Sequence, residues 1–312
     1  MRRIFPIGGG KGGSGKSFLT ANLGALLARR GQRVLLVDLD LGGANLHTLL
    51  GVRNPGVGLD VFLERRCRFL EQVIVQTMMP GLHIIPSMNC SMEISNLFYQ
   101  QKLKIIKAIR GIASYDYILL DLGAGTNFNT IDFFLISDEG LFVVTPEPTS
   151  IENTFRFIRA VYVRKIKQLL KQKEFLTVQR ELQDQSAHHF VRTPSEIIDR
   201  VAGFDPEKGR SLQERLSRFR LRFILNQFRR HSDATLGAKI ERVCNRHFHS
   251  TFHFLENVGY DERVHDSIAT KDIYVNRYPY TSTAGALENI ARKIAENGNP
   301  YPLPLEQHAR EI

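Results

Sequence analysis

The stretch that decides the fold is Gly8-Gly9-Gly10-Lys11-Gly12-Gly13-Ser14-Gly15-Lys16-Ser17. An apolar segment, Ile4 to Ile7, precedes it, and a segment with helical character, Phe18 to Arg30, follows it and stops at Gly31. A glycine-rich loop between a strand and a helix is the pattern of a P-loop. Its glycines let successive backbone N–H groups approach phosphate oxygens, and the helix N-terminus adds its own unpaired N–H groups. We therefore predict a phosphate-binding site at this loop.

Several residues of the loop are expected to bind the phosphates directly. Lys16 would place a positive charge at the β- and γ-phosphates, and the Ser17 hydroxyl would ligate Mg²⁺. A flexible glycine-rich linker is the alternative interpretation, but such linkers do not carry Gly-Lys-Ser between a strand and an amphipathic helix. The predicted nucleotide-binding residues of the loop are Gly10, Gly12, Gly13, Ser14, Gly15, Lys16 and Ser17.

A second lysine, Lys11, stands at the start of the loop. The segment Lys11 to Ser17 resembles the deviant Walker A motif of the MinD/ParA class of ATPases. In that class the early lysine reaches across a dimer interface to the nucleotide of the partner subunit. The resemblance therefore implies ATP and Mg²⁺ as ligands and an ATP-dependent homodimer, with Lys11 and Lys16 both acting on the phosphates. The spacing alone would not show the dimer.

Two carboxylates follow the next apolar run, Arg33 to Val37. Such a run suits a buried parallel strand, and the carboxyl ends of parallel strands form the ligand crevice of open α/β sheets. The resemblance assigns Asp40 to switch I, where the matching aspartate orients the attacking water. Asp38 could assist at the metal. The alternative, that these carboxylates cap the next helix, stays open, for Asp38 in particular.

A further buried strand, Tyr115 to Asp121, ends in an aspartate. This is a Walker B pattern, in which Asp121 would hold the Mg²⁺ hydration shell. The following segment, Leu122 to Gly125, resembles switch II, which reads D-x-P-A-G in much of the family. Here Gly123 replaces the proline, which loosens the backbone at that position.

The resemblance extends further along the chain. Asn226, at the end of the run Arg222 to Asn226, matches the asparagine that contacts adenine in the family. The segment Thr145 to Ser150 is close to one in FlhG-like proteins, where its acids and prolines would shape the dimer face. Glu147 could instead be a simple helix-start acid. Segments Asp40 to Leu46 and Gly81 to Pro86 resemble the FlhG branch, the ATPases that govern flagellar number and placement.

Positive charge is concentrated in one region. The net charge is +10, and the stretch from Arg159 to Arg230 has 17 Lys/Arg and 8 Asp/Glu. We predict a helical insertion at about 165–220, with two helices that begin at capping boxes. These are Thr193 to Glu196 and Ser211 to Glu214, and Gly203 to Gly209 would join the helices.

The basic insertion is expected to bind a partner. Leu212, Leu216 and Phe219 share a helix with arginines, and mixed apolar and arginine surfaces favour a protein partner, such as a GTPase or a polar scaffold. Nucleic acid or lipid headgroups remain alternatives. A second amphipathic helix is predicted over Gln101 to Ile112, with Leu103, Ile106 and Ile109 on one face.

Composition excludes several classes of protein. The absence of a long apolar run and of a signal-peptide pattern predicts a cytoplasmic protein. Cys67, Cys90 and Cys244 are isolated, which argues against an iron–sulfur carrier of the same class. The tail, residues 299–312, contains Pro300, Pro302 and Pro304, so no C-terminal membrane-targeting helix is expected.

Taken together, these patterns predict a doubly wound α/β fold, with a mostly parallel sheet flanked by helices and a helical insertion. Residues 1–298 would form one P-loop ATPase domain and 299–312 a tail. The predicted function is that of a slow Mg-ATP-dependent dimerising switch that positions or regulates a cellular assembly, as the FlhG resemblance implies. A DNA-binding partition ATPase of the ParA type is the alternative.

Overall fold

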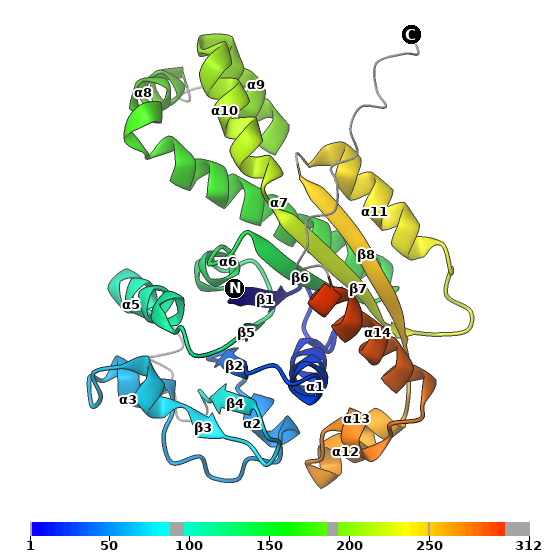
Figure 1. Cartoon of the computed structure of the whole chain (residues 1–312). Helices are drawn as coiled ribbons and strands as arrows, with labels where there is room; N and C mark the ends of the chain where they lie inside the picture. Colours follow the sequence, from blue (N-terminus) through cyan, green and yellow to red (C-terminus); the bar gives the residue numbers. More distant parts are fainter. Residues whose placement is uncertain (1, 88–96, 186–192, 249, 297–312) are drawn as a thin grey trace.

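The computed structural model describes residues 2–87, 97–185, 193–248 and 250–296. Its centre is an eight-stranded sheet in the order β3-β4-β2-β5-β1-β6-β7-β8 (Figure 1). All neighbouring strands run parallel except β3, which is antiparallel to β4. The strands are β1 (Arg3–Gly8), β2 (Val34–Leu39), β3 (Val75–Gln76), β4 (Leu82–Ile85), β5 (Tyr117–Leu122), β6 (Glu139–Val144), β7 (Arg220–Phe228) and β8 (Thr251–Gly259).

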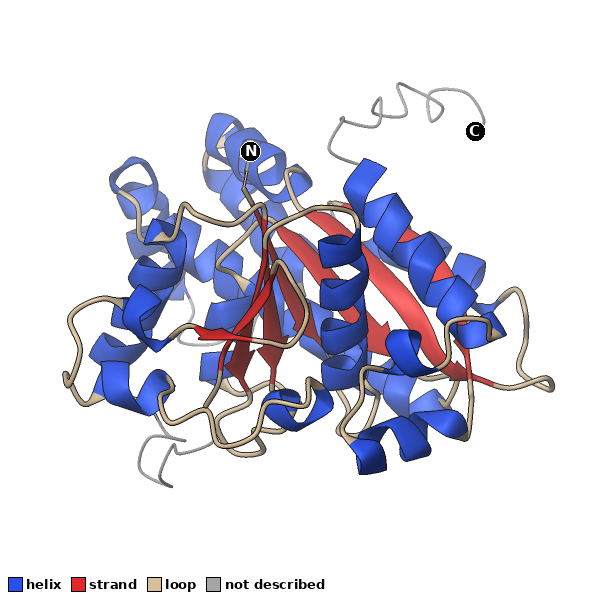
Figure 2. Ribbon diagram, turned by 60° about the horizontal axis from the view of Figure 1, so that its bottom comes forward, coloured by secondary structure: helices blue, strands red, loops and turns tan. Residues whose placement is uncertain are grey.

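Helices cover both faces of the sheet (Figure 2). The longer ones are α1 (Lys16–Arg29), α5 (Tyr99–Gly111), α6 (Phe128–Phe134), α7 (Pro148–Leu170), α8 (Leu176–Gln185), α9 (Pro194–Phe204), α10 (Pro206–Ser217), α11 (Leu236–His247), α12 (Arg263–Thr270) and α14 (Ser282–Glu296). Short ones are α2 (Leu46–Leu49), α3 (Leu59–Leu63), α13 (Tyr274–Arg277) and the 3-10 turns Leu70–Val73 and Lys173–Phe175. The predicted doubly wound α/β fold is confirmed.

Strand β2 shows why this sequence takes two helical layers. Side chains alternate across a strand, so Leu35 and Val37 enter one hydrophobic core while Val34 and Leu36 enter the other. All four are fully buried. One core lies under α5, α6 and α7, and the other lies under α1 and α14. A strand that is apolar at every position can be buried on both faces only between two layers of helices.

The segment predicted as an insertion begins later than expected. Helix α7 continues without interruption to Leu170, and three helices, α8, α9 and α10, stand between it and β7. They project from the far end of α7 as a lobe beyond the sheet (Figure 1). Thr193 caps α9 as predicted, because its hydroxyl accepts from the Glu196 N–H at 3.3 Å.

Two details of that prediction are wrong. Ser211 to Glu214 lies inside α10, whose N-cap is Asp205, with its carboxylate accepting from the N–H groups of Glu207 and Lys208 at 3.0 Å. Asp205 alone separates α9 from α10, because it caps α10 and directly precedes Pro206 at the first helical position. The predicted loop over Gly203 to Gly209 is therefore wrong.

The apolar residues of α10 do not form a docking surface. Leu212 and Leu216 are fully buried, as is Phe219 just after the helix, because α10 packs against α9 and α7. The argument that favoured a protein partner on this helix is therefore wrong. Arg222 is buried as well, within β7, where it pairs with Glu139 at 3.4 Å.

The surplus of positive charge lies outside the lobe of α8 to α10. Residues 176–217, which contain α8 to α10, have six Lys/Arg and seven Asp/Glu. Residues 156–173, from the outer half of α7 to the next turn, have seven Lys/Arg and no acid. The lobe is close to neutral, and the surplus is divided between the outer half of α7 with the turn after it and the stretch from Arg218 to Arg230, which has five Arg and no acid.

The C-terminal residues of the chain, 297–312, lie outside the described part. The expected tail at 299–312 is among them, and the description of one ATPase domain over 1–298 stays an interpretation. Within the described part, no helix is both long enough and apolar enough to cross a bilayer.

Candidate functional site

The P-loop lies at the carboxyl end of β1 and leads into α1. Gly13 and Gly15 adopt φ values of 74° and 91°, in the left-handed region that favours glycine. Gly10 packs so closely on α7 that an added Cβ would lie 2.1 Å from the carbonyl oxygen of Asn153. The loop therefore requires glycine for its turn and for its contact with α7.

Unpaired polar groups gather at this loop. Gly15 caps α1 without any side-chain acceptor, so the first N–H groups of the helix have no capping partner. The Ser14 hydroxyl oxygen is buried and has no hydrogen-bond partner among the described residues. A cradle of free donors at a helix N-terminus fits a phosphate group.

Lys16 is the buried cation of the site. Its side chain is only 7% exposed, and burial lowers its pKa, opposed by the carboxylates of Asp121 and Asp40. A lysine enclosed between acids and a phosphate cradle supplies a charge that water screens little. The predicted phosphate-binding lysine therefore has a suitable position.

Asp38 and Asp121 lie side by side on neighbouring strands, β2 and β5, in direct register. Burial raises the pKa of Asp38 well above its usual value, and the Asp121 charge adds to this. Burial likewise raises the pKa of Asp121 to about 7, although the Ser17 hydroxyl and Lys16 counteract it. Two buried carboxylates with too few cations fit a site that takes a divalent cation through Ser17 and Asp121.

Asp38 also stabilises the loop after β2. Its carboxylate accepts from the N–H of Asp40 at 3.2 Å and from that of Leu46, the first residue of α2, at 3.3 Å. The helix-capping alternative for Asp38 is therefore present in the structure. Its role at a metal stays a prediction.

The raised pKa of Asp121 predicts an effect of pH on stability. Between pH 3.8 and about 7 the folded protein retains a proton that the unfolded chain has lost, so the free energy of unfolding falls as pH rises. Without nucleotide and Mg²⁺ at pH 7.5, Asp121→Asn should therefore raise that free energy, with about 4 kcal/mol as the ceiling.

Chemical denaturation across pH tests this expectation. The gain should shrink toward pH 4, where the wild-type carboxyl is protonated in both states, so the same variant supplies its own control. If Asp121→Asn were less stable than wild type at pH 7.5, Asp121 would not be a buried carboxylate with too little compensating positive charge.

Asp40 lies against the segment that resembles switch II. A Cβ added to Gly123 would come within 3.0 Å of the Asp40 carboxylate oxygen Oδ1, so glycine leaves room for this side chain. Gly123 does not have a positive φ, so the backbone conformation itself does not demand glycine. The glycine that replaces proline at position 123 thus leaves space for the Asp40 side chain.

Lys11 does not join the buried acids. Its ammonium group donates to the Glu147 carboxylate, and both side chains are partly exposed. Glu147 precedes α7 but makes no capping bond with its side chain. The structure therefore places a second P-loop lysine at the surface, paired with Glu147.

Asn226 reaches the loop from the end of β7. Its side-chain amide donates to the Ser14 carbonyl at 2.8 Å, and the neighbouring Gln227 donates to the Gly13 carbonyl, also at 2.8 Å. Gln227 has a φ of 57°, which turns it toward the loop. Asn226 thus lies beside the nucleotide cradle, and its contact with adenine stays a prediction.

A model of the CobQ/CobB/MinD/ParA nucleotide binding domain matches residues 6–274. The chain belongs to this family. The antiactivator FleN of Pseudomonas aeruginosa is 26% identical over 97% of this chain and 88% of its own length, in agreement with the FlhG resemblance. The septum site-determining protein MinD of Synechocystis is 33% identical over 51% of this chain and 59% of its own length.

Solved structures share the fold. The cell division ATPase MinD of Pyrococcus furiosus has a TM-score of 0.66 at 24% identity, over 95% of this chain and 99% of that one. A ParA family ATPase of Chlorobium tepidum has a TM-score of 0.60 at 20% identity, over 93% and 98%. These structures show the fold, and the family match shows the nucleotide-binding class.

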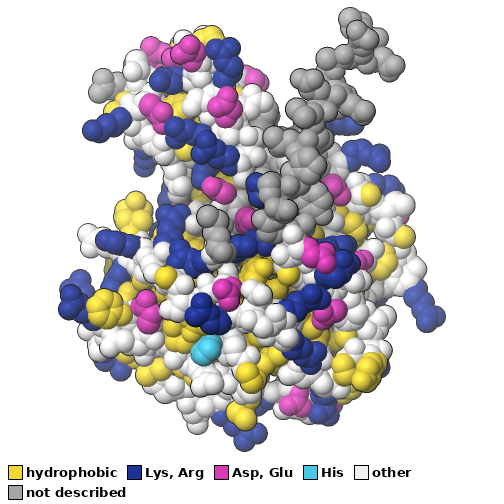
Figure 3. Space-filling view, in the orientation of Figure 1, with side chains coloured by type: hydrophobic (Ala, Val, Ile, Leu, Met, Phe, Trp, Pro, Cys, Tyr) yellow, Lys and Arg dark blue, Asp and Glu magenta, His cyan; other side chains and the backbone are white. Residues whose placement is uncertain are grey.

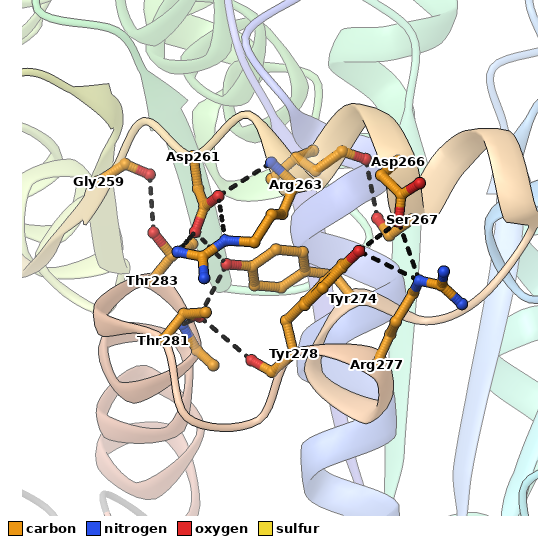
Figure 4. Close-up of polar contacts among 12 residues, drawn as sticks. Gly259, Asp261, Arg263, Asp266, Ser267, Tyr274, Arg277, Tyr278, Thr281 and Thr283 are labelled. Atoms are coloured by element: carbon orange, nitrogen blue, oxygen red, sulfur yellow. Dashed lines mark hydrogen bonds and ion pairs between the residues drawn. The ribbon is translucent and has the colours of Figure 1, made fainter.

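A polar network joins the loop after β8 to α12 and α13 (Figure 4). The Arg263 guanidinium makes two hydrogen bonds to Asp261, each 2.9 Å, and the buried Tyr274 donates to Asp261 at 2.6 Å. These contacts fix the loop after β8.

Two residues of the site were missed from the sequence. Thr20, one turn after Lys16, donates to the Asp121 carboxylate at 3.3 Å and to the Lys16 carbonyl at 2.9 Å. Its position four residues after the loop lysine could have indicated this contact. Gln227 had no such signal, because its approach to Gly13 depends on the left-handed turn after Asn226.

Proposed function

We propose that this chain is an Mg-ATP-dependent ATPase switch that dimerises with ATP bound and releases the dimer after hydrolysis. The observation that carries the proposal is the division of the two P-loop lysines. Lys16 is buried beside Asp121, whereas Lys11 lies at the surface beside Glu147. Two lysines in one loop that point to different surroundings suit one nucleotide contact within the subunit and one across a dimer.

The site residues have distinct roles in this proposal. The P-loop N–H groups and Lys16 bind the phosphates, and Ser17 and Asp121 would hold Mg²⁺, whose charge offsets that of the phosphoryl oxygens when it is bound. Asp40 orients the attacking water. A MinD of Pyrococcus horikoshii is known as a complex with Mg-ADP, which supports this ligand pair.

The similarity to FleN supports a regulatory role through a protein partner. The MinD of Aquifex aeolicus, which shares this fold, is known in a complex with MinC, and this supports binding to another protein. The DNA-partition alternative depended on a basic insertion. Since the lobe of α8 to α10 carries no positive surplus, the insertion itself does not favour that alternative.

Sedimentation velocity tests the proposed dimer. Wild type should be monomeric with ADP and dimeric with a non-hydrolysable ATP analogue and Mg²⁺. Lys11→Ala should bind the analogue but stay monomeric, because the contact across the interface is lost. Lys239→Ala, which also removes a lysine from an exposed ion pair, is the matched control and should dimerise. A Lys11→Ala protein that dimerises as wild type does would contradict the assignment.

A further inference from the structure

Two helices beside the sheet carry almost only basic charges. Helix α5 contains four Lys/Arg and no acid, and α7 contains five Lys/Arg with one acid, Glu152, near its start. Figure 3 shows Lys and Arg gathered on the left of the molecule, between α5 and the lobe of α8 to α10. This basic surface surrounds a cleft.

The cleft between α5 and α7, called the α5–α7 groove below, has a volume of about 580 Å³. Its apolar wall is formed by Leu103 and Ile106 of α5 and by Leu135. Leu103 is 45% exposed, whereas Ile105 and Ile109 enter the core, so the predicted apolar face of Leu103, Ile106 and Ile109 is buried only in part. The basic rim of the groove is formed by Arg110, Lys167 and Lys171.

A buried charge cluster fixes the floor of the groove. Asp132 of α6 accepts two hydrogen bonds from Arg164 of α7, at 2.7 and 2.8 Å, and pairs with the buried Lys102 of α5. Burial alone would raise the pKa of Asp132, but the bonds from Arg164 and Lys102 hold it below its usual value. Because one carboxylate joins three helices, the groove is preformed and its only acid is already paired.

The rim cations are available to a ligand. Within the described part of the chain, Lys167 and Lys171 have no carboxylate within 4.0 Å, and Arg110 donates only to the Ile136 carbonyl, at 3.1 and 2.9 Å. By contrast, Lys165, which does not line the groove, pairs with Asp138 at 3.0 Å. Unpaired cations therefore occur where α7 faces the groove.

We propose that the α5–α7 groove binds an acidic amphipathic helix of a partner protein. Acidic side chains of the ligand would meet Arg110, Lys167 and Lys171, and its apolar stripe would cover Leu103 and Ile106. A nucleic acid backbone would match the rim charges but would leave the apolar wall of the groove uncovered.

The groove also adjoins the proposed switch. A second cavity, of about 710 Å³, shares Tyr99, Lys102 and Arg164 with it, and Asp40 and Gly123 line that cavity too. A ligand in the groove would thus lie next to residues that the nucleotide is expected to move. This link rests on the proposed function, whereas the docking itself does not.

Peptide selection tests the docking. Random peptides of about 16 residues, roughly four helical turns, are displayed on phage and selected on the full chain with Mg-ADP. The enriched peptides should be net acidic, with apolar residues recurring at helical spacing. Enrichment of peptides without acidic character, or no enrichment, would overturn the proposal.

Variants then locate the bound peptide. The most enriched peptide, labelled with fluorescein, should bind Lys167→Glu/Lys171→Glu roughly tenfold or more weakly than wild type. Arg242→Glu/Arg246→Glu on α11 makes the same charge change on exposed residues far from the groove and should leave binding unchanged. Equal losses in both variants would mean nonspecific attraction and would also overturn it.

An uncharged change separates a protein ligand from nucleic acid. Leu103→Gln removes part of the apolar wall and should weaken the peptide but not fluorescein-labelled random duplex DNA. DNA that binds tightly, with steep salt dependence and loss in Lys167→Glu/Lys171→Glu but not in Leu103→Gln, would assign the groove to nucleic acid instead.

Discussion

Lys16→Ala should abolish Mg-ATP binding, with an affinity at least about 100-fold lower, or about 3 kcal/mol. Lys16 is almost fully buried beside Asp121 and Asp40, and it is the cation that we expect at the β- and γ-phosphates. Removing it leaves the negative charges of the triphosphate, Asp121 and Asp40 without their principal counter-charge. Isothermal titration calorimetry measures the loss directly.

Lys11→Ala is the matched control for this experiment. It removes the other lysine of the same loop, but one that is partly exposed and paired with Glu147. A single subunit with this change should therefore retain its affinity for Mg-ADP. Circular dichroism should show that both variants fold. Unchanged affinity of Lys16→Ala for Mg-ATP would mean that the P-loop assignment is wrong.

Asp40→Ala should bind ATP normally but turn it over roughly 100-fold or more slowly, because the attacking water loses the group that orients it. Asp40 borders the site without supporting the loop as Asp38 does, so the fold and the phosphate contacts should persist. If the dimer is released only after hydrolysis, this variant should accumulate as a dimer with ATP.

Single-turnover hydrolysis and sedimentation together decide the outcome. Asp116→Ala removes an exposed carboxylate just before β5, at the opposite end of the strand from Asp121, and should hydrolyse ATP at the wild-type rate. A nucleotide-bound Asp40→Ala protein that sediments as a monomer would contradict the dimer model. Normal turnover by Asp40→Ala would remove Asp40 from the mechanism.

Much of the site could be predicted because its chemistry is local in sequence. The P-loop needs only glycines, Lys16 and the start of α1, all within one short stretch. The predicted positions of Asp38 and Asp121 followed from a topological rule, since parallel strands end at one edge of a sheet. Their direct register on β2 and β5 confirms it.

Other features depend on residues far apart in the chain. Glu147 lies 136 positions from Lys11, and Asn226 lies 212 positions from Ser14, so the partners of these side chains follow from the packing of whole strands. The sequence resemblance indicated that both residues matter. It could not indicate which atoms they contact.

The basic region shows most clearly which features depend on local sequence and which depend on packing. The P-loop, the apolar strands, the acids at their ends and the total positive charge could be predicted from the sequence, because each depends on residue type and near neighbours. That Leu212 and Leu216 are buried, and that unpaired cations line a groove between α5 and α7, became known only from the packed structure. The physical reason is that helical periodicity defines an apolar face but not whether another helix covers it.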